Sequence, residues 1–359
     1  MITFNSLQTN CQICPLLCET CEDNNLDLVL DPLSLYKVKC YSCKQQLPNN
    51  YGDMQKYEIR YDKARMRCIY CLKNDNGCFF KKKTEIFAEC GTASQPLGKG
   101  TFDEPLNLYK INETNLDQLI INEPEFDIGI IYYNELQLRE IDFIINFIDK
   151  SRLCNLDFAL SISTNIKNKI PSIQTLSITL NANQTNSLTD YEMLQNDIAT
   201  FKGFSSFKIQ NMNVKPKNLN SNFGFKIYEE NINNIEFQNT TFLCQRQYTN
   251  QLQTYFDNFN GTFIMNNTLF NNCSFYQQTL INVHSDFYPT FITYQLTNLS
   301  ILYSDFSQKS SFISVNSPSD LEIQDFKFMH GSLSYQSNVF ASYYQGQEVT
   351  IIAVNLKQK

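Results

Sequence analysis

Apolar and polar residues alternate in short runs along the second half of the chain, and one run contains an informative break. In "NIEFQNTTF", Asn234 to Phe242, apolar side chains occur at Ile235 and Phe237, the alternation stops at Asn239, and it resumes one residue out of phase at Phe242. Because a strand places alternate side chains on opposite faces, this change of phase requires a tight bend near Asn239. Asn tolerates the left-handed backbone of such a bend better than most residues do.

The same nonamer recurs about every 27 residues. At its fourth position, Phe270 is taken as the equivalent of Phe237, and Ile351 as the equivalent of Ile323. The six copies begin at Ser206, Asn234, Asn267, Thr293, Asp320 and Glu348. The sixth position is Ala353 in the last copy, and in the others it holds Asn211, Asn239, Asn272, Asn298 and Asp325. We expect these five side chains to stack in successive turns and to form a hydrogen-bonded ladder.

Each repeat supplies a few short strands but only half of a core. Such a unit cannot fold alone, and stacked neighbours would bury a continuous interior. The repeat resembles the right-handed parallel β-helix of pectin-lyase-like proteins, in which an asparagine ladder occupies one of the turns. That resemblance implies a mainly β fold, with parallel β-helix repeats over residues 171–359.

The segment before the repeats, residues 96–170, has a mixed pattern and is expected to cap the β-helix. It follows a region rich in Gly, Pro and Ser, "GTASQPLGKG", that is typical of a linker. In "NELQLREIDFIINFIDKS", apolar residues between Leu138 and Ile148 are spaced by three and four, and Asn134 can act as an N-cap. This spacing predicts an amphipathic helix. The flanking runs "FDIGIIYY" and "NLDFALSIST" predict strands.

Cysteine is concentrated in residues 1–95, which we interpret as a separate module. Of 13 cysteines, ten lie there, and the odd total predicts at least one thiol that is free or paired with another chain if disulfides form. This density favours a small module stapled by disulfides. The ten residues are Cys11, Cys14, Cys18, Cys21, Cys40, Cys43, Cys68, Cys71, Cys78 and Cys90.

The cysteine spacing has two interpretations. The stretch "CPLLCETCED", followed by Cys40-x2-Cys43, resembles the furin-like or growth-factor-receptor-like cysteine-rich repeats of large extracellular proteins. The alternative is zinc, because Cys18, Cys21, Cys40 and Cys43 have the spacing of a four-thiolate site. A second zinc site would combine Cys68 and Cys71 with Cys11 and Cys14.

Seven Asn-x-Ser/Thr sequons occur in the chain. Three of them, at Asn239, Asn272 and Asn298, coincide with the predicted ladder, where a buried amide could not carry a glycan. The remaining four are the candidate N-glycosylation sites of a secreted protein, namely Asn112, Asn183, Asn260 and Asn266.

Charge and hydropathy exclude some classes of protein. The net charge of −7 argues against a general nucleic-acid binder, which needs a basic surface. No apolar run reaches the roughly 18 to 20 residues that span a bilayer. The N-terminus lacks the pattern of a secretory signal, and the last repeat would leave an open β edge. We therefore expect the chain to be part of a longer polypeptide, with any signal peptide or anchor outside it.

No catalytic constellation emerges from the sequence. Asp320 and Glu348 could stack in adjacent turns, but one column of two acids is typical of a solvated edge, and His284 and His330 each stand alone. We therefore expect a non-enzymatic extracellular or cell-surface protein with a structural, adhesion or recognition role and no cofactor. Its partner would be a protein or a glycan. The alternatives are an intracellular zinc-binding interaction protein and a β-helix carbohydrate-active lyase or hydrolase.

Overall fold

The chain forms two compact units. The computed structural model describes residues 2–5, 8–13, 18–23, 38–44, 57–62, 67–72, 80–121, 138–148, 153–182, 191–228, 232–257, 259–284, 292–315, 319–342, 349–354 and 357–358. One unit comprises Met1–Lys82, Glu123–Ile141 and Lys167–Gln174, and the other comprises Lys83–Asn122, Asp142–Ile166 and Thr175–Lys359. The second unit therefore contains residues on both sides of the predicted boundaries near 95 and 170.

The described residues of the first unit form three antiparallel strand pairs. Each pair joins strands that are close in sequence, as expected of a small loop-rich module. The pairs are β1 (Ile2–Asn5) with β2 (Gln8–Ile13), β3 (Cys18–Asp23) with β4 (Val38–Cys43), and β5 (Tyr57–Asp62) with β6 (Arg67–Leu72).

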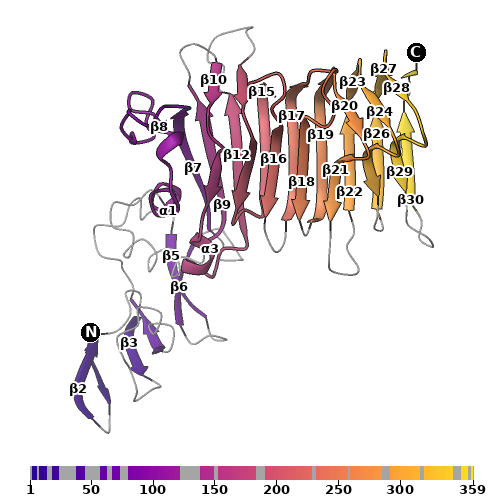
Figure 1. Ribbon diagram of the computed structural model, residues 1–359. Helices are drawn as coiled ribbons and strands as arrows, with labels where there is room; N and C mark the ends of the chain where they lie inside the picture. The colour runs from indigo at the N-terminus through magenta and orange to yellow at the C-terminus, as the bar shows by residue number, and fades with distance from the viewer. Residues whose placement is uncertain are drawn as a thin grey trace. The chain divides into compact units, whose positions relative to one another are not determined.

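The second unit is built on stacked parallel strands (Figure 1). The largest sheet runs in the order β30 (Val349–Val354), β26 (Ser319–Gln324), β22 (Ile292–Thr297), β19 (Phe259–Asn271), β17 (Ile232–Leu243), β15 (Ser206–Pro216), β12 (Thr175–Ala182), β9 (Leu138–Phe147), β7 (Phe80–Glu89) and β8 (Leu106–Asn107). Further strands join it beyond a bend, namely β10 (Leu153–Leu156), β13 (Glu192–Gln195), β23 (Ser300–Leu302), β27 (Lys327–Met329) and β31 (Lys357–Gln358).

The described residues form two more parallel sheets, and the second of them has strands from three turns only. The first contains β11 (Ser161–Ser163), β14 (Ile198–Lys202), β16 (Phe223–Tyr228), β18 (Leu252–Asp257), β21 (Thr279–His284), β25 (Ser311–Val315) and β29 (Asn338–Ser342). The second contains β20 (Ser274–Tyr276), β24 (Asp305–Ser307) and β28 (Ser332–Leu333). Successive strands of one sheet come from successive turns, so this parallel arrangement is compatible with a β-helix.

The register follows the predicted repeat in four copies and departs from it in two. Ile209 lies opposite Phe237, but Phe237 lies opposite Met265, and Phe270 lies opposite Phe242. The alignment that made Phe270 the equivalent of Phe237 is therefore wrong by five residues. Both positions in each copy are apolar, so the apolar pattern fits either register.

The register of the last copy also differs from the prediction. Ile351 lies opposite Leu321, and Ala353 lies opposite Ile323. The predicted equivalence of Ile351 and Ile323 is therefore wrong by two residues. A shift of two residues keeps the same side chains on the same face of a strand, so the hydrophobic pattern cannot detect it.

The predicted helix around residues 138–148 is a strand, β9. Ile141, Phe143, Ile145 and Phe147 are all buried, and they alternate along the strand. Their side chains fit the helical period as well, but Ile and Phe favour strands, and neighbouring strands pair on both sides of β9. The predicted flank "NLDFALSIST" does contain two strands, β10 and β11, whereas "FDIGIIYY" lies outside the described residues.

The helices are short. In the part of the chain that the structure describes, they are η3 (Leu108–Lys110), α1 (Glu113–Ile121) and α3 (Ile166–Lys169). Asn112 precedes α1, and its Oδ1 accepts a hydrogen bond from the backbone N–H of Asn115, as an N-cap does. None of the helices in the described segments is long and apolar enough to cross a membrane.

The core of the second unit is a row of buried side chains, many of them aromatic. The rings of Phe242 and Phe270, from adjacent turns, stack with centroids 4.8 Å apart and planes 12° apart. The rings of Phe275 and Phe306 stack in the same way at 4.9 Å. Because each turn contributes rings to the turns before and after it, the core is continuous, and each ring adds a large buried apolar area.

Candidate functional site

A row of asparagine side chains follows one bend of the second unit. Each Nδ2 donates a hydrogen bond to the Oδ1 of the asparagine in the preceding turn, over 2.7 to 3.0 Å. In order along the row, the residues are Asn146, Asn181, Asn211, Asn239, Asn267 and Asn298. The last four have positive φ values between 48° and 60°, the left-handed backbone that the bend requires.

The row includes some of the predicted ladder residues and excludes one. Asn211, Asn239 and Asn298 belong to it, and Asp325 has the same left-handed backbone in the next turn, with φ at 55°. Asn272 was predicted to belong and does not, because the register places Asn267 there instead. Asn146 and Asn181 were missed, although Asn181 ends an alternating run, "LSITLN", that could have revealed it.

The sequons fall into two groups. Asn239 and Asn298 are exposed, contrary to the prediction that ladder amides are buried, but each uses its Nδ2 to donate within the row. Asn272 lies at a different bend, where it is exposed and has φ at 57°. Of the four predicted glycosylation sites, Asn183 lies outside the described residues, and the exposed ones are Asn112, Asn260 and Asn266.

The side chains considered for catalysis are not brought together. Asp320 lies opposite Thr350 in the adjacent strand, so the predicted stack of Asp320 on Glu348 is wrong. His330 is exposed, and its ring stacks on that of Tyr303 with centroids 4.9 Å apart. His284 ends β21, its side chain lies outside the described part, and so does Glu348.

The structure contains four disulfides among its described residues. They join Cys18 to Cys40, Cys43 to Cys68, Cys90 to Cys154 and Cys244 to Cys273, with Cα–Cα distances of 4.8 to 5.6 Å. That distance range is the usual one for disulfides. Of the other predicted cysteines, Cys14 and Cys78 lie outside the described residues, as do the side chains of Cys11, Cys21 and Cys71.

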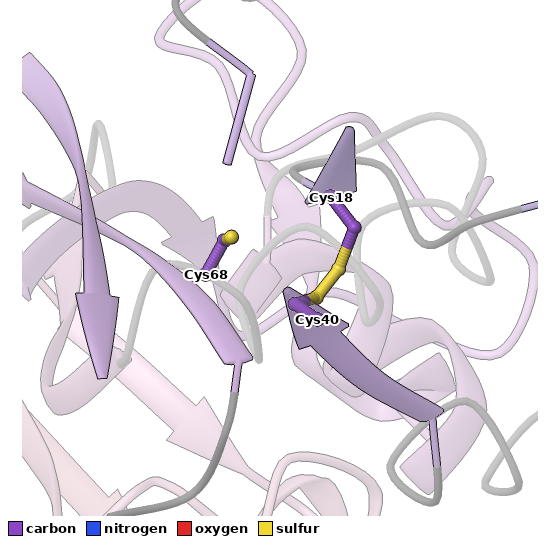
Figure 2. Close-up of side chains that lie close together, drawn as sticks. All are labelled: Cys18, Cys40 and Cys68. Atoms are coloured by element: carbon purple, nitrogen blue, oxygen red, sulfur yellow. A yellow bond between two sulfur atoms is a disulfide. The ribbon is translucent and has the colours of Figure 1, made fainter. Parts of the chain in front are cut away.

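Three buried cysteines of the first unit lie close together. The sulfur atoms of Cys18, Cys40 and Cys68 are all within 4.8 Å of one another, and Figure 2 shows these side chains with the Cys18–Cys40 disulfide. Thiolates are good zinc ligands, but a sulfur in a disulfide is not a thiolate. These three residues therefore fit zinc only in a reduced protein.

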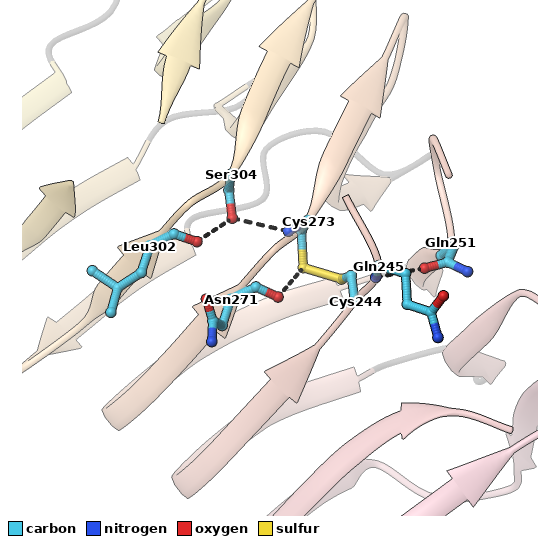
Figure 3. The surroundings of a disulfide bond; sticks show 7 residues. All are labelled: Cys244, Gln245, Gln251, Asn271, Cys273, Leu302 and Ser304. Atoms are coloured by element: carbon cyan, nitrogen blue, oxygen red, sulfur yellow. Dashed lines mark hydrogen bonds between the residues drawn. A yellow bond between two sulfur atoms is a disulfide. The ribbon is translucent and has the colours of Figure 1, made fainter. Parts of the chain in front are cut away.

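Two disulfides involve cysteines beyond the cysteine-rich segment. Cys154, Cys244 and Cys273 are not in CxxC pairs, so the sequence showed no partner for them. Around the Cys244–Cys273 disulfide, the N–H of Cys244 donates to Asn271 O. The N–H of Cys273 donates to Ser304 Oγ (Figure 3). This disulfide therefore joins adjacent turns at a point where backbone hydrogen bonds already hold them in register.

A salt bridge spans three turns beside this disulfide. The guanidinium of Arg246 donates to both carboxylate oxygens of Asp305, over 2.5 and 2.8 Å, and Ser332 Oγ donates to Asp305 Oδ1 over 2.6 Å. Burial alone would raise the pKa of Asp305. The hydrogen bonds from Arg246 and Ser332 outweigh burial, so the pKa of Asp305 lies below its usual value.

A pocket of about 360 Å³ opens along β16, β18 and β21. Phe225 also lines the pocket, but its ring is buried in the core against Phe201, Phe207 and Phe242. Gly224 lets the backbones of β16 and β18 approach closely here, because its φ is 139° and a Cβ at this position would lie 1.8 Å from Gln253 O. The polar side chains around the pocket include Lys226, Gln253, Tyr255, Gln278 and Thr279.

Lys226 is held between two tyrosine rings. It lies directly opposite Tyr255 in the adjacent strand, and Tyr228 follows two residues later on the same face. Its ammonium nitrogen lies 4.6 Å from the ring centroid of Tyr228 and 5.1 Å from that of Tyr255. Rings at this distance stabilise a cation.

The chemistry of this pocket suits ligand binding. Its lining residues, all within the described part of the chain, include no carboxylate, histidine or cysteine. Gln253 Nε2 donates to Asn250 O over 3.2 Å, and Thr279 Oγ1 shares a hydrogen bond with Ser311 Oγ. The lining is thus one cation surrounded by amides, a hydroxyl and aromatic rings, which can hold a polar ligand in one orientation.

Comparison with known proteins assigns neither a family nor a function to this chain. The chain matches no protein-family model, no curated protein and no solved structure. The pectin-lyase-like and furin-like resemblances therefore depend on the sequence patterns quoted above, and what the structure adds is the mainly β, parallel and disulfide-bonded architecture.

Proposed function

We propose that this chain is a non-enzymatic extracellular or cell-surface protein with a structural, adhesion or recognition role. The observation that carries the proposal is the Cys244–Cys273 disulfide between adjacent turns of the second unit. Disulfides persist in oxidising compartments and are rare in the cytosol. The Cys90–Cys154 disulfide supports the same environment for the same unit.

The finer fold is part of this proposal. We assign residues 171–359 to a right-handed parallel β-helix of the pectin-lyase-like type, preceded by a furin-like module in residues 1–95. The asparagine row, with its spacing of 28 residues between Asn211 and Asn239, supports the assignment. Right-handedness follows from the strong preference of parallel strands for right-handed connections. Such a scaffold presents a long surface suited to recognition.

N-glycosylation is a further part of the proposed extracellular role. Asn112, Asn260 and Asn266 are exposed, which suits glycan attachment, and Asn183 stays a candidate from the sequence alone. Asn239 and Asn298 are not proposed as acceptors, because a glycan on Nδ2 would remove a hydrogen bond of the asparagine row. Mapping of glycosylated asparagines in the protein from its own cell tests this division.

The proposal is tested by the intact mass of the protein taken from its own cell. Thiols are alkylated before reduction in one sample and after reduction in another, so that the difference counts the cysteines in disulfides. We expect Cys90, Cys154, Cys244 and Cys273 to be alkylated only after reduction. Alkylation of all four before reduction would exclude the extracellular role.

An intracellular zinc-binding interaction protein is the second candidate, and one observation favours it. The three buried sulfur atoms of Cys18, Cys40 and Cys68 lie close enough to bind one ion once reduced. The same sample distinguishes the candidates, because this alternative requires free thiols and bound zinc in the native mass. Zinc that is released by a thiol-reactive reagent, together with free Cys18 and Cys40, would favour the alternative.

A further inference from the structure

We propose that the pocket beside Lys226 binds a small polar ligand through a single carboxylate group. This inference deepens the recognition role proposed above and rests on it. Its basis is a cation with no carboxylate partner among the described residues, inside a pocket of suitable size. The pocket volume of about 360 Å³ falls in the range of roughly 300 to 1,000 Å³ that is typical of small-molecule sites.

The charge of Lys226 is not balanced by the protein in the described residues. Other lysines on nearby strands have carboxylate partners, as Lys208 has in Glu236 at 2.9 Å and Lys215 has in Glu192 at 2.5 Å. Within the described chain, no carboxylate lies within ion-pair distance of Lys226, although its side chain is only partly exposed. A partly buried cation is costly unless paired, so an anionic ligand would gain from completing the pair.

The single positive charge of Lys226 suits a carboxylate better than a phosphate. The lining contains one lysine and no arginine, so it can balance about one negative charge. A phosphate monoester carries between one and two negative charges and has three acceptor oxygens, which calls for several donors or an arginine fork. A carboxylate carries one charge and needs fewer donors.

The rest of the lining indicates the remainder of the ligand. The amide groups of Gln253 and Gln278 can pair with hydroxyl or amide groups. The ring of Tyr255 offers an apolar face beside Lys226. We infer a hydroxylated or amide-bearing carboxylic acid, with its carboxylate at Lys226 and its carbon skeleton against Tyr255.

Matched pairs of probes test the carboxylate requirement. Calorimetric titration of the full chain with its disulfides intact uses N-acetylasparagine against its neutral C-terminal amide, and gluconate against sorbitol, so that each pair differs only in one carboxylate. We expect at least one acid to bind about tenfold more tightly than its neutral partner, and inorganic phosphate to bind more weakly than that acid. Equal binding within both pairs, absence of binding by both acids, or tighter binding of phosphate would overturn the proposal.

Substitutions locate the site. Lys226→Met should weaken binding of the preferred acid by about tenfold, and Lys226→Arg should retain most of it because the charge remains. Lys327→Met is the matched control, since Lys327 is an exposed lysine on β27 away from the pocket lining, and binding should not change. Thermal unfolding of each variant checks that it folds. Unchanged binding in Lys226→Met, or equal loss in Lys327→Met, would refute the site.

The two proposals fail separately. A protein with free thiols in its cell that still binds the acid at Lys226 would refute the extracellular role and support the pocket. A disulfide-bonded protein that binds neither acid would refute the pocket and leave the extracellular role in place.

Discussion

The side chain of Asn239 donates a hydrogen bond of 3.0 Å to Asn211, which lies 28 residues earlier and one turn away. Asn239 also accepts a hydrogen bond of 2.9 Å from Asn267 in the following turn. Each amide inside the row therefore contributes both its donor and its acceptor, so the bend that requires a left-handed residue also joins the turns together. An Asn meets both requirements, whereas Gly meets only the first.

Replacement of Asn239 should destabilise the fold without affecting the pocket. Asn239→Gly keeps the left-handed backbone and loses two side-chain hydrogen bonds, so we expect a loss of about 1 to 2 kcal/mol in the free energy of unfolding. Asn239→Ala should lose more, since Ala also strains the bend. Urea unfolding measures both, with the exposed neighbour Asn266→Ala as control. A control that loses as much as Asn239→Gly would contradict the role of the row.

The salt bridge at Asp305 predicts a dependence of stability on pH. Because its pKa is lower in the folded than in the unfolded protein, the salt bridge stabilises the fold above the ordinary carboxyl pKa of about 4 and stops doing so as the pH falls through the folded pKa. Asp305→Asn should therefore cost about 0.5 to 1 kcal/mol at pH 7, a small value because Arg246 is half exposed.

The difference between wild type and Asp305→Asn should shrink below pH 4. Urea unfolding at a series of pH values measures it. Asp320→Asn serves as control, because Asp320 is an exposed acid on β26. A constant difference across the pH range would show that Asp305 acts through packing and not through its charge.

Removal of the Cys244–Cys273 disulfide should destabilise the second unit. The two cysteines are 29 residues apart, and in the chain-entropy model a loop of this length corresponds to about 3 to 4 kcal/mol. We expect Cys244→Ala with Cys273→Ala to lower the free energy of unfolding by that amount, and with it the urea midpoint. A reducing agent should lower the urea midpoint of the wild type. It should lower the midpoint of the double variant less, because this disulfide is already missing there. Equal midpoints of wild type and variant under oxidising conditions would contradict a stabilising disulfide.

Gly224 should not tolerate a side chain. Ala at this position would place its Cβ against the backbone oxygen of Gln253 in a positive-φ conformation, so β16 and β18 would have to separate. We expect Gly224→Ala to cost about 1 to 3 kcal/mol and to weaken carboxylate binding in the pocket beside it. Lys202→Ala, an exposed position on the neighbouring β14, is the control for stability. Full stability and full binding in Gly224→Ala would show that the close approach is not required.

The sequence alone determined that the second half of the chain consists of similar units, each made of short β-strands, that stack on one another. Alternating apolar residues specify strands because the side-chain period of a strand is two, and the break at Asn239 specifies a bend because only a few residue types accept left-handed backbone. The period of about 27 residues follows from these local signals and needs no knowledge of contacts. The prediction of Asn211, Asn239 and Asn298 as members of the asparagine row has the same origin.

Only the tertiary structure decided how the turns are paired and which side chains meet. Apolar residues at both Met265 and Phe270 fit the core, and the strand opposite decides which of them faces Phe237. Residues 138–147 satisfy the helical and the strand period together, and their neighbours in the sheet make them a strand. Cys90 bonds to Cys154, and Lys226 lies opposite Tyr255, because successive turns lie side by side. A local sequence pattern does not identify which residues of two such turns will be partners.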